Sequence, residues 1–423
     1  MPRHWSQEPH WLSTADGPRS ERTQSRRSRM KESSSMEILD YIEAYWPRIV
    51  RNVSVDEGTL IGLPRPYMAP AEDPIFQEMF YWDSYFTAVG LSGTPREQLV
   101  VDMAENMVAM LRRFGMIPNA SRLYFLSRSQ PPLSTAMFRL AFETKEARGD
   151  ADACAFLAEA MNLAALEHRS VWLGEIHPHI RRVHAGLSRY FDANYTDELA
   201  SFESGWDRST RCQNRWLDHL PICLNSVLYL REIDLEWASR RLGDDESADA
   251  WRSAADARAA SVRDLMWDET AGLFFDFDYV AGKRDGVATL AAFFPLWSGL
   301  ASQSEADRMV GEWLPKFSQP GGLATSLTAR DGHQWAWPNG WAPLQWIVVA
   351  GLERYGFREE AMRIMRAWCD TCVLSFEKTG AMWEKYNVVE VGSPPVDDRY
   401  GSVSGFGWTN AVFLDFHRRL GDR

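Results

Sequence analysis

Ten segments of the chain repeat apolar residues at the i, i+3, i+4, i+7 spacing of an amphipathic helix, and this succession restricts the possible folds most strongly. Several of them end in a glycine that follows basic residues, as helices commonly do. Only residues 272–280, GLFFDFDYV, have the pattern of a strand, which predicts one minor β-hairpin. We therefore expect an all-α fold in which paired helices close on themselves and bury two layers. The ten segments cover residues 36–50, 95–115, 134–147, 151–174, 225–243, 246–267, 303–317, 342–356, 358–377 and 407–421.

The first 35 residues differ in composition from the rest of the chain. They are rich in Ser, Arg and Gln and show almost no aliphatic periodicity, which predicts a disordered tail over residues 1–35. Residues 36–423 are expected to form a single domain. The tail lacks the apolar core, about 7–15 residues long, of an export signal, and no stretch approaches the roughly 18 apolar residues of a membrane span. A cytoplasmic location is therefore expected.

Charge and cysteine content restrict the classes of ligand and cofactor that the protein is expected to bind. Lys and Arg number 46 against 58 Asp and Glu, a net charge of −12, which argues against a nucleic acid or a membrane surface and suits a small neutral ligand such as a sugar or glycoside. The five cysteines form no disulfide framework and no metal-ligand pattern, and no phosphate loop or nucleotide fingerprint occurs. We expect neither a cofactor nor a metal, and the sequence does not indicate an oligomeric state.

Residues 334–346, QWAWPNGWAPLQW, hold four tryptophans in thirteen residues around a Pro-Asn-Gly turn. Aromatic faces stack on the apolar faces of sugar rings, and the polar edges of a turn can bind the hydroxyls around the rim. The alternative is a tryptophan-rich corner of the core.

Further motifs follow one another along the chain. They are FQEMFYWDSYFTAVGL (76–91), IPNASRLYFLSRSQPP (117–132), ESGWDRSTR (203–211), EKYN (384–387) and GFGWTNAVFLDF (405–416). Together with PNGWAP (338–343), these segments resemble the signatures of the trehalases, a family of inverting α-glycosidases. The resemblance implies an (α/α)6 barrel whose site lies at the end where the Trp-rich loops gather.

The resemblance also implies a general acid and one glucose-like subsite. Asp207 stands at the place of the family's catalytic Asp; an N-cap role for the same residue is compatible with catalysis. Gly205 permits close approach of a sugar, and Trp206 offers an apolar wall that would raise the pKa of the acid by desolvation. The implied sugar contacts are Trp82, Asp83, Asn119, Arg128, Gln130, Gln334, Asn339 and Trp341.

Inversion also requires a second carboxylate that activates water. At the position expected for the family's base, six residues before the glycine of GFGWTN, the chain has Arg399, which cannot accept a proton. A shifted loop makes Asp398 the first candidate and Asp397 the second, with Glu384 and Glu203 as further candidates. The alternative for residues 397–399 is a solvated turn with a local ion pair.

The chain also departs from the trehalase signatures at other positions of the implied pocket. Ile75 stands where the family has an arginine, Ala336 replaces a carboxylate, and residues 193–202 replace a segment that contacts the second sugar. Two hypotheses follow. One is a trehalase-like inverting hydrolase that acts on trehalose or a related small α-glucoside. The other is a non-hydrolytic relative, either a sugar-binding protein or an enzyme for another reaction on a glycoside or cyclitol, in which Arg399 could bind an anionic group of the aglycone.

Overall fold

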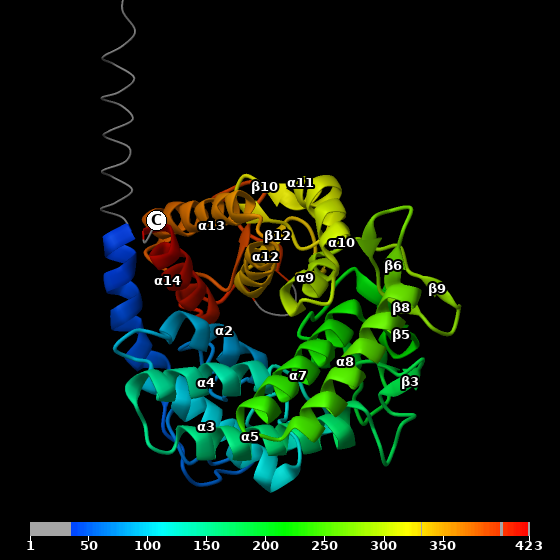
Figure 1. Cartoon of the computed structure of the whole chain (residues 1–423). Coiled ribbons are helices and arrows are strands. Elements are labelled where there is room, and N and C mark those ends of the chain that lie inside the picture. The colour runs from blue at the N-terminus through cyan, green and yellow to red at the C-terminus, as the bar shows by residue number, and fades with distance from the viewer. Residues whose placement is uncertain (1–34, 331, 398–400, 422–423) are drawn as a thin grey trace, which may run out of the picture.

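The computed structural model describes residues 35–330, 332–397 and 401–421. Residues 1–34 of the expected tail, Asp398 and Arg399 lie outside these residues, whereas residue 35, the last of the expected tail, begins a helix. The described part is mainly helical, and its helices form two concentric layers around one axis (Figure 1). Among its helices, none combines the length and apolarity needed to cross a bilayer.

Six helices form the inner layer. Each contacts the next along the chain, and α14 packs against α2 to close the ring. All residues of α2 and of α9 are buried, because both helices are covered on every side. The inner helices are α2 (Tyr81–Leu91), α4 (Ser134–Arg148), α7 (Ile222–Arg241), α9 (Phe294–Ser298), α12 (Ala342–Arg354) and α14 (Gly407–Gly421).

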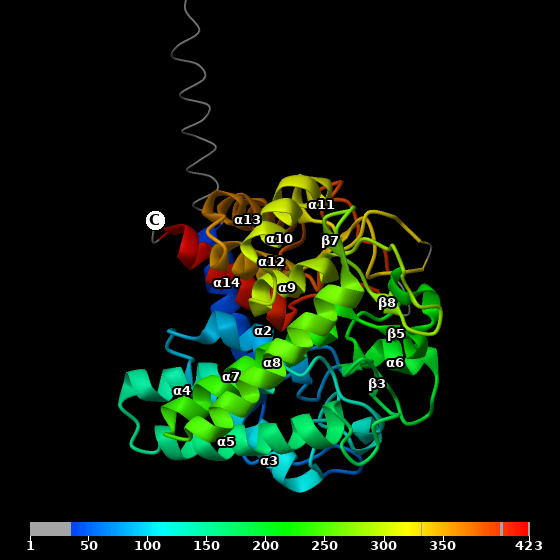
Figure 2. The ribbon, with the colours of Figure 1, turned by 45° about the vertical axis from the view of Figure 1, so that its right-hand side comes forward.

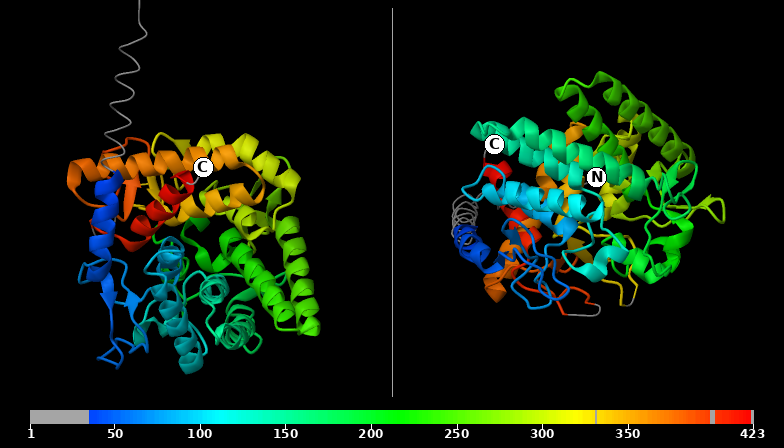
Figure 3. Two further views of the ribbon diagram at one scale, coloured as in Figure 1. Left: turned by 60° about the vertical axis from the view of Figure 1, so that its left-hand side comes forward. Right: turned by 90° about the horizontal axis from the view of Figure 1, so that it is seen from below.

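The outer helices pack against the inner ones with a single apolar face. The long pair α7 and α8 lies side by side (Figure 2). The first helix, residues 35–49, lies against α13, where the rings of Tyr41 and Phe376 approach to 5.2 Å (Figure 3). The outer layer comprises that helix, α3 (Gln98–Phe114), α5 (Ala153–Glu167) with η2 (His168–Trp172), α8 (Asp245–Met266), α10 (Gln303–Arg308) with η6 (Met309–Trp313) and α11 (Leu314–Phe317), and α13 (Arg358–Thr379). This closed double ring confirms the expected (α/α)6 barrel.

Short strands and helical turns occupy the loops. The expected hairpin at 272–280 is divided between two small sheets, because β7 pairs with β6 whereas β8 joins β5 and β9. The strand pairs are β1 (Val50–Arg51) with β2 (Tyr67–Met68), β3 (Arg182–His184) with β4 (Leu187–Ser188), β6 (Trp267–Asp268) with β7 (Leu273–Phe274), β10 (Ser318–Gln319) with β11 (Gly322–Leu323), and β12 (Asn339–Trp341) with β13 (Lys385–Asn387); the triple is β5 (His219–Leu220), β8 (Phe277–Asp278) and β9 (Lys283–Arg284). The remaining elements are α6 (Asp197–Glu203), η1 (Leu123–Ser127), η3 (Arg211–Asn214), η4 (Trp216–Asp218) and η5 (Leu290–Phe293).

Candidate active site

A pocket opens at the end of the barrel where several inner helices begin. Trp82 and Asp83 lie in the first turn of α2, Trp341 directly precedes α12, and Trp408 lies in the first turn of α14. Helix N-termini carry partial positive charge, which favours the oxygen-rich groups gathered here. The lining residues are Phe76, Phe80, Trp82, Asp83, Asn119, Phe125, Arg128, Gln130, Phe202, Gly205, Asp207, Gln334, Trp335, Trp341, Glu384, Phe406 and Trp408.

The pocket has the size of one sugar ring. Its volume is about 150 Å³, close to that of a cavity known to hold a single benzene ring. Four half-buried phenylalanines line it, and they can stack on a ring at its mouth. These are Phe76, Phe80, Phe125 and Phe202.

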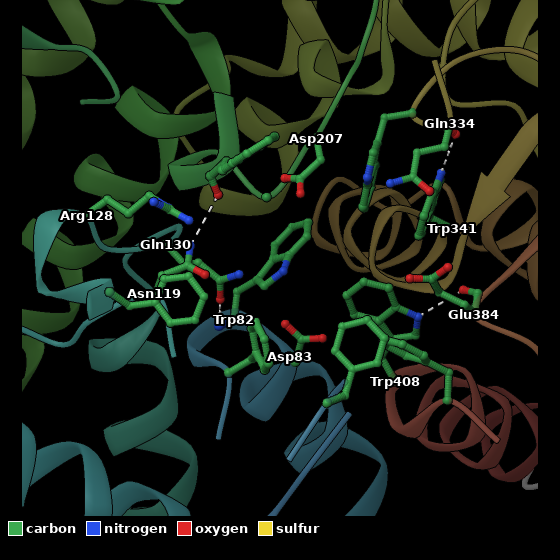
Figure 4. Close-up of a pocket in the computed structure, with 17 residues that line it drawn as sticks. Trp82, Asp83, Asn119, Arg128, Gln130, Asp207, Gln334, Trp341, Glu384 and Trp408 are labelled. Atoms are coloured by element: carbon green, nitrogen blue, oxygen red, sulfur yellow. Dashed lines mark hydrogen bonds between the residues drawn. The ribbon is translucent and has the colours of Figure 1, made fainter. Parts of the chain in front are cut away.

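Three carboxyl groups share this small space. Asp207 is half-buried, whereas Asp83 and Glu384 are 8% and 2% exposed. Figure 4 shows Asp207 and Glu384 on opposite sides of the pocket, with Asp83 at a third corner. Burial raises the pKa of Asp83 well above its usual value, and the charges of Glu384 and Asp207 raise it further. These effects favour the protonated form of Asp83, which can donate a hydrogen bond to a sugar hydroxyl.

A strained loop presents Asp207. Gly205 has a φ of +72°, and a Cβ atom there would lie 2.7 Å from the indole of Trp82, so only glycine fits. The next turn is anchored to the Trp-rich run, because the amide of Trp335 donates to the carbonyl of Arg208 at 3.4 Å. Arg208 itself has a φ of +51°. Such strain is typical of functional sites.

A two-stranded ladder fixes Glu384. Strand β12 pairs with β13, with Trp341 opposite Lys385, so the Trp-rich run and the EKYN segment lie side by side. The indole of Trp408 donates to the Glu384 carbonyl at 3.0 Å, and the Lys385 ammonium lies 2.9 Å from the Glu384 Oε2. Both the backbone and the carboxylate of Glu384 are therefore held.

Polar groups predicted to contact a sugar also line the pocket. Gln130 accepts from the Trp82 amide at 3.0 Å, and Asn119 donates to the Ser129 carbonyl at 2.9 Å. Arg128 pairs with Asp192 at 3.0 Å.

Two side chains that line the pocket, those of Arg128 and Gln334, keep unused hydrogen-bonding capacity. The Arg128 Nε and the Gln334 Oε1 are buried without a hydrogen-bond partner among the described residues. Because buried polar atoms are normally bonded, these two are suited to a bound hydroxyl.

Stacked indoles form the apolar wall. Trp335 and Trp341 stack with centroids 3.8 Å apart and planes 4° apart. Trp82 lies against Trp335 at 5.6 Å, and Trp408 meets Trp82 edge-on at 5.9 Å. Trp335 and Trp408 were not among the predicted contacts, although both lie within the motifs that the sequence offers. Among the described residues, no cluster of His, Cys, Asp or Glu could hold a metal ion.

Comparison with known proteins decides the family. The sequence profile of the trehalase family matches residues 3–201 and 179–421. The periplasmic trehalase of Escherichia coli O1:K1 is 31% identical over 422 residues, which cover 89% of this chain and 73% of the relative.

The chain belongs to the trehalase family.

Solved structures agree with this assignment. The neutral trehalase of Saccharomyces cerevisiae superposes with a TM-score of 0.74 at 28% identity, over 84% of this chain and 75% of that one. A GH63 mannosylglycerate hydrolase of Thermus thermophilus in complex with glucose shares the fold, with a TM-score of 0.67 at 19% identity over 90% and 99% of the two chains. This chain is a trehalase-like glycoside hydrolase, and the non-hydrolytic alternative is not favoured.

Of the candidate bases, the structure describes Asp397, Glu203 and Glu384. Asp397 is not among the lining residues, because its carboxylate binds Lys385 at 3.1 Å and accepts from the Ser402 hydroxyl at 2.7 Å. Glu203 is fully buried, and its two oxygens accept from the amides of Ser129 and Phe191 at 2.7 Å each. Among the candidate bases that the structure describes, Glu384, placed behind the aspartates by sequence, lines the pocket.

Two predicted contacts lie behind the pocket wall. Trp206 is fully buried against Trp335, with ring centroids 5.5 Å apart. Asn339 donates to the carbonyls of Gln334 and Val396 at 2.9 and 2.8 Å, and so ties two loops together. Neither residue lines the pocket, whereas Gly205 and the other predicted contacts do.

Proposed function

We propose that this trehalase-family enzyme hydrolyses trehalose or a related small α-glucoside with inversion, using Asp207 as general acid and Glu384 as general base. One observation carries the proposal: the two carboxylates lie on opposite sides of a pocket with room for one sugar ring. Inverting glycosidases need that arrangement, because a water molecule attacks one face of the ring while the leaving group departs from the other.

Each group has a defined part in the proposed reaction. One glucose ring fills the pocket against the stacked indoles, and the second sugar lies at the mouth. Glu384 takes a proton from water as the water oxygen bonds to the anomeric carbon. Asp207 gives its proton to the glycosidic oxygen as the old bond breaks. The products are two glucose molecules, one of them released as the β-anomer.

The surroundings support these two roles. Two neighbouring groups hold Glu384 in place, as a base that must point at one water requires. The buried carboxyl of Asp83 and the unpartnered atoms of Arg128 and Gln334 can bind ring hydroxyls. These contacts favour a neutral ring with several hydroxyls, such as glucose.

Two variants and two substrates test the assignment. Asp207→Asn should lower kcat/KM for trehalose by about 10²–10⁴-fold, but much less for α-glucosyl fluoride, whose leaving group needs little protonation. Glu384→Gln should lower kcat/KM by about 10²–10⁴-fold for both substrates, because both need activated water. The exposed Asp249→Asn and Glu269→Gln variants are the controls. Full activity of Glu384→Gln would overturn the assignment of the base.

We retain a cytoplasmic location as a proposal, on the ground that all five cysteines are free thiols, four of them buried. The E. coli relative is named a periplasmic enzyme, so the compartment is a separate question. Fractionation of the native host, with immunodetection of the chain, tests it. Recovery in the periplasmic fraction would contradict the proposal.

A further inference from the structure

Lys385 lies between the candidate base and a second carboxylate. Its side chain is fully buried. Its ammonium lies 2.9 Å from the Glu384 Oε2 and 3.1 Å from the Asp397 Oδ1. The same ammonium lies 5.3 Å from the ring centroid of Trp341, the strand partner of Lys385. A buried lysine with two carboxylates and an indole face around it has a fixed position.

The strand β13 separates two cavities at this point. Glu384 lines the sugar pocket, whereas Lys385 and Asp397 line a neighbouring cavity of about 360 Å³. Lys385 is not among the residues that line the sugar pocket, so it can act on the reaction only through neighbours that do, and its ion pair with Glu384 is the direct contact.

The positive charge of Lys385 affects the ionisation of Glu384. The base must be ionised to accept a proton, yet Glu384 is 2% exposed and shares the pocket with the carboxyls of Asp83 and Asp207. Burial and like charge both favour the protonated form of a carboxyl. The ammonium of Lys385 offsets both effects, and Asp397, whose side chain is 40% exposed, holds it from the other side. Lys378 of α13 lines the outer cavity and donates to the Gly392 carbonyl at 3.5 Å.

We propose that Lys385 is the positioning residue for the base Glu384: its ammonium orients the Glu384 carboxylate and keeps it ionised, and Asp397 anchors the ammonium. The proposal rests on the function proposed above. It gives Asp397 a place in the site one step removed from the base.

The pH dependence of kcat/KM for α-glucosyl fluoride tests the role of Lys385, since its acid limb reports the base. Lys385→Met should move that limb upward by about 1–3 pH units, with KM little changed and activity recovering at high pH. Lys385→Arg should keep the limb near its original position. Lys378→Met, which removes a lysine from the same outer cavity, is the matched control and should leave the profile unchanged.

Asp397→Asn should shift the acid limb in the opposite direction. The substitution removes one of the negative charges that surround the ammonium, so the limb should move downward by up to about one unit. This variant carries the test if Lys385→Met does not fold. A loss of activity in Lys385→Met that is equal at every pH, or an unchanged limb in Asp397→Asn, would overturn the role of Lys385. Activity in Glu384→Gln would instead overturn the proposed base itself.

Discussion

At the scale of single residues, the site depends on close approach between the loop of Asp207 and the indole of Trp82. Gly205 makes that approach possible, because a Cβ atom would meet two indole carbons at 2.7 Å. The sequence motif ESGWD predicted that Gly205 permits close approach of a sugar. It could not show that the atom excluded belongs to Trp82, more than a hundred residues earlier in the chain.

Gly205→Ala should therefore damage catalysis more than folding. Displacement of the Trp82 indole or of Asp207 by a few tenths of an ångström to about 1 Å should lower kcat/KM by up to about 10²-fold. Gly282→Ala is the matched control, because Gly282 also has a positive φ, +66°, but no atom within 4 Å of the added methyl. Both variants should lose stability, by about 1 kcal/mol from the backbone strain alone. Equal kcat/KM for the two variants would contradict the argument.

At the scale of secondary structure, the periodic helices were predictable and the fully buried ones were not. Each of the ten amphipathic segments forms a helix. The helices α2 and α9 escaped prediction because every residue in them is buried, which leaves no polar face and no helical period in the sequence. The ladder of β12 and β13 also escaped, since its strands lie more than forty residues apart and each is three residues long. That ladder brings Glu384 to the pocket. Because the ladder was not predicted, the sequence offered no reason to rank Glu384 above Asp398 and Asp397 as the candidate base.

Asp285, which follows β9, makes the free energy of unfolding depend on pH. Burial, and to a smaller extent the nearby Asp276 carboxylate, raise the pKa of Asp285 to about 7. Asp276 is itself paired with the buried Arg211 at 2.8 Å, beneath Trp206. The folded protein thus keeps a proton on Asp285 that the unfolded chain releases near pH 4. The stability due to this proton is complete below about pH 4 and declines as the pH rises to about 7.

Asp285→Asn should remove this dependence. In urea unfolding at pH 5 and pH 8, the wild-type free energy of unfolding should fall as pH rises. The free energy of unfolding of the variant should fall less between these pH values. At pH 8 the variant should be more stable than the wild type, by at most about 4 kcal/mol. The exposed Asp245→Asn is the control. Parallel pH profiles for wild type and Asp285→Asn would contradict the assignment.

At the scale of the whole molecule, the contact between α14 and α2 closes the barrel. Gly90 permits this contact, because a Cβ atom there would lie 2.2 Å from the Ala411 carbonyl oxygen. Periodicity alone predicted paired helices. That the helices form an (α/α)6 barrel followed from the resemblance to trehalases, since no single helix pattern states which neighbour it packs against.

Gly90→Ala should destabilise the closed ring strongly. Backbone atoms of α14 would have to move, so we expect a loss of about 1–3 kcal/mol or more and a clear drop in Tm. Gly311→Ala is the matched control, because Gly311 also lies in a helical segment but has no atom within 4 Å of the added methyl. The control should be neutral or slightly stabilised. Equal Tm values for the two variants would show that the ring closes in another way.

The central claim is that two carboxylates facing each other across a one-ring pocket hydrolyse an α-glucoside with inversion. Proton NMR of trehalose hydrolysis, read before the products mutarotate, tests this most directly. We expect α- and β-glucose in equal amounts from the first spectra, because one ring is inverted and the other leaves unchanged. Formation of α-glucose alone would show retention, and no hydrolysis of trehalose or of any small α-glucoside would contradict the proposed hydrolytic activity.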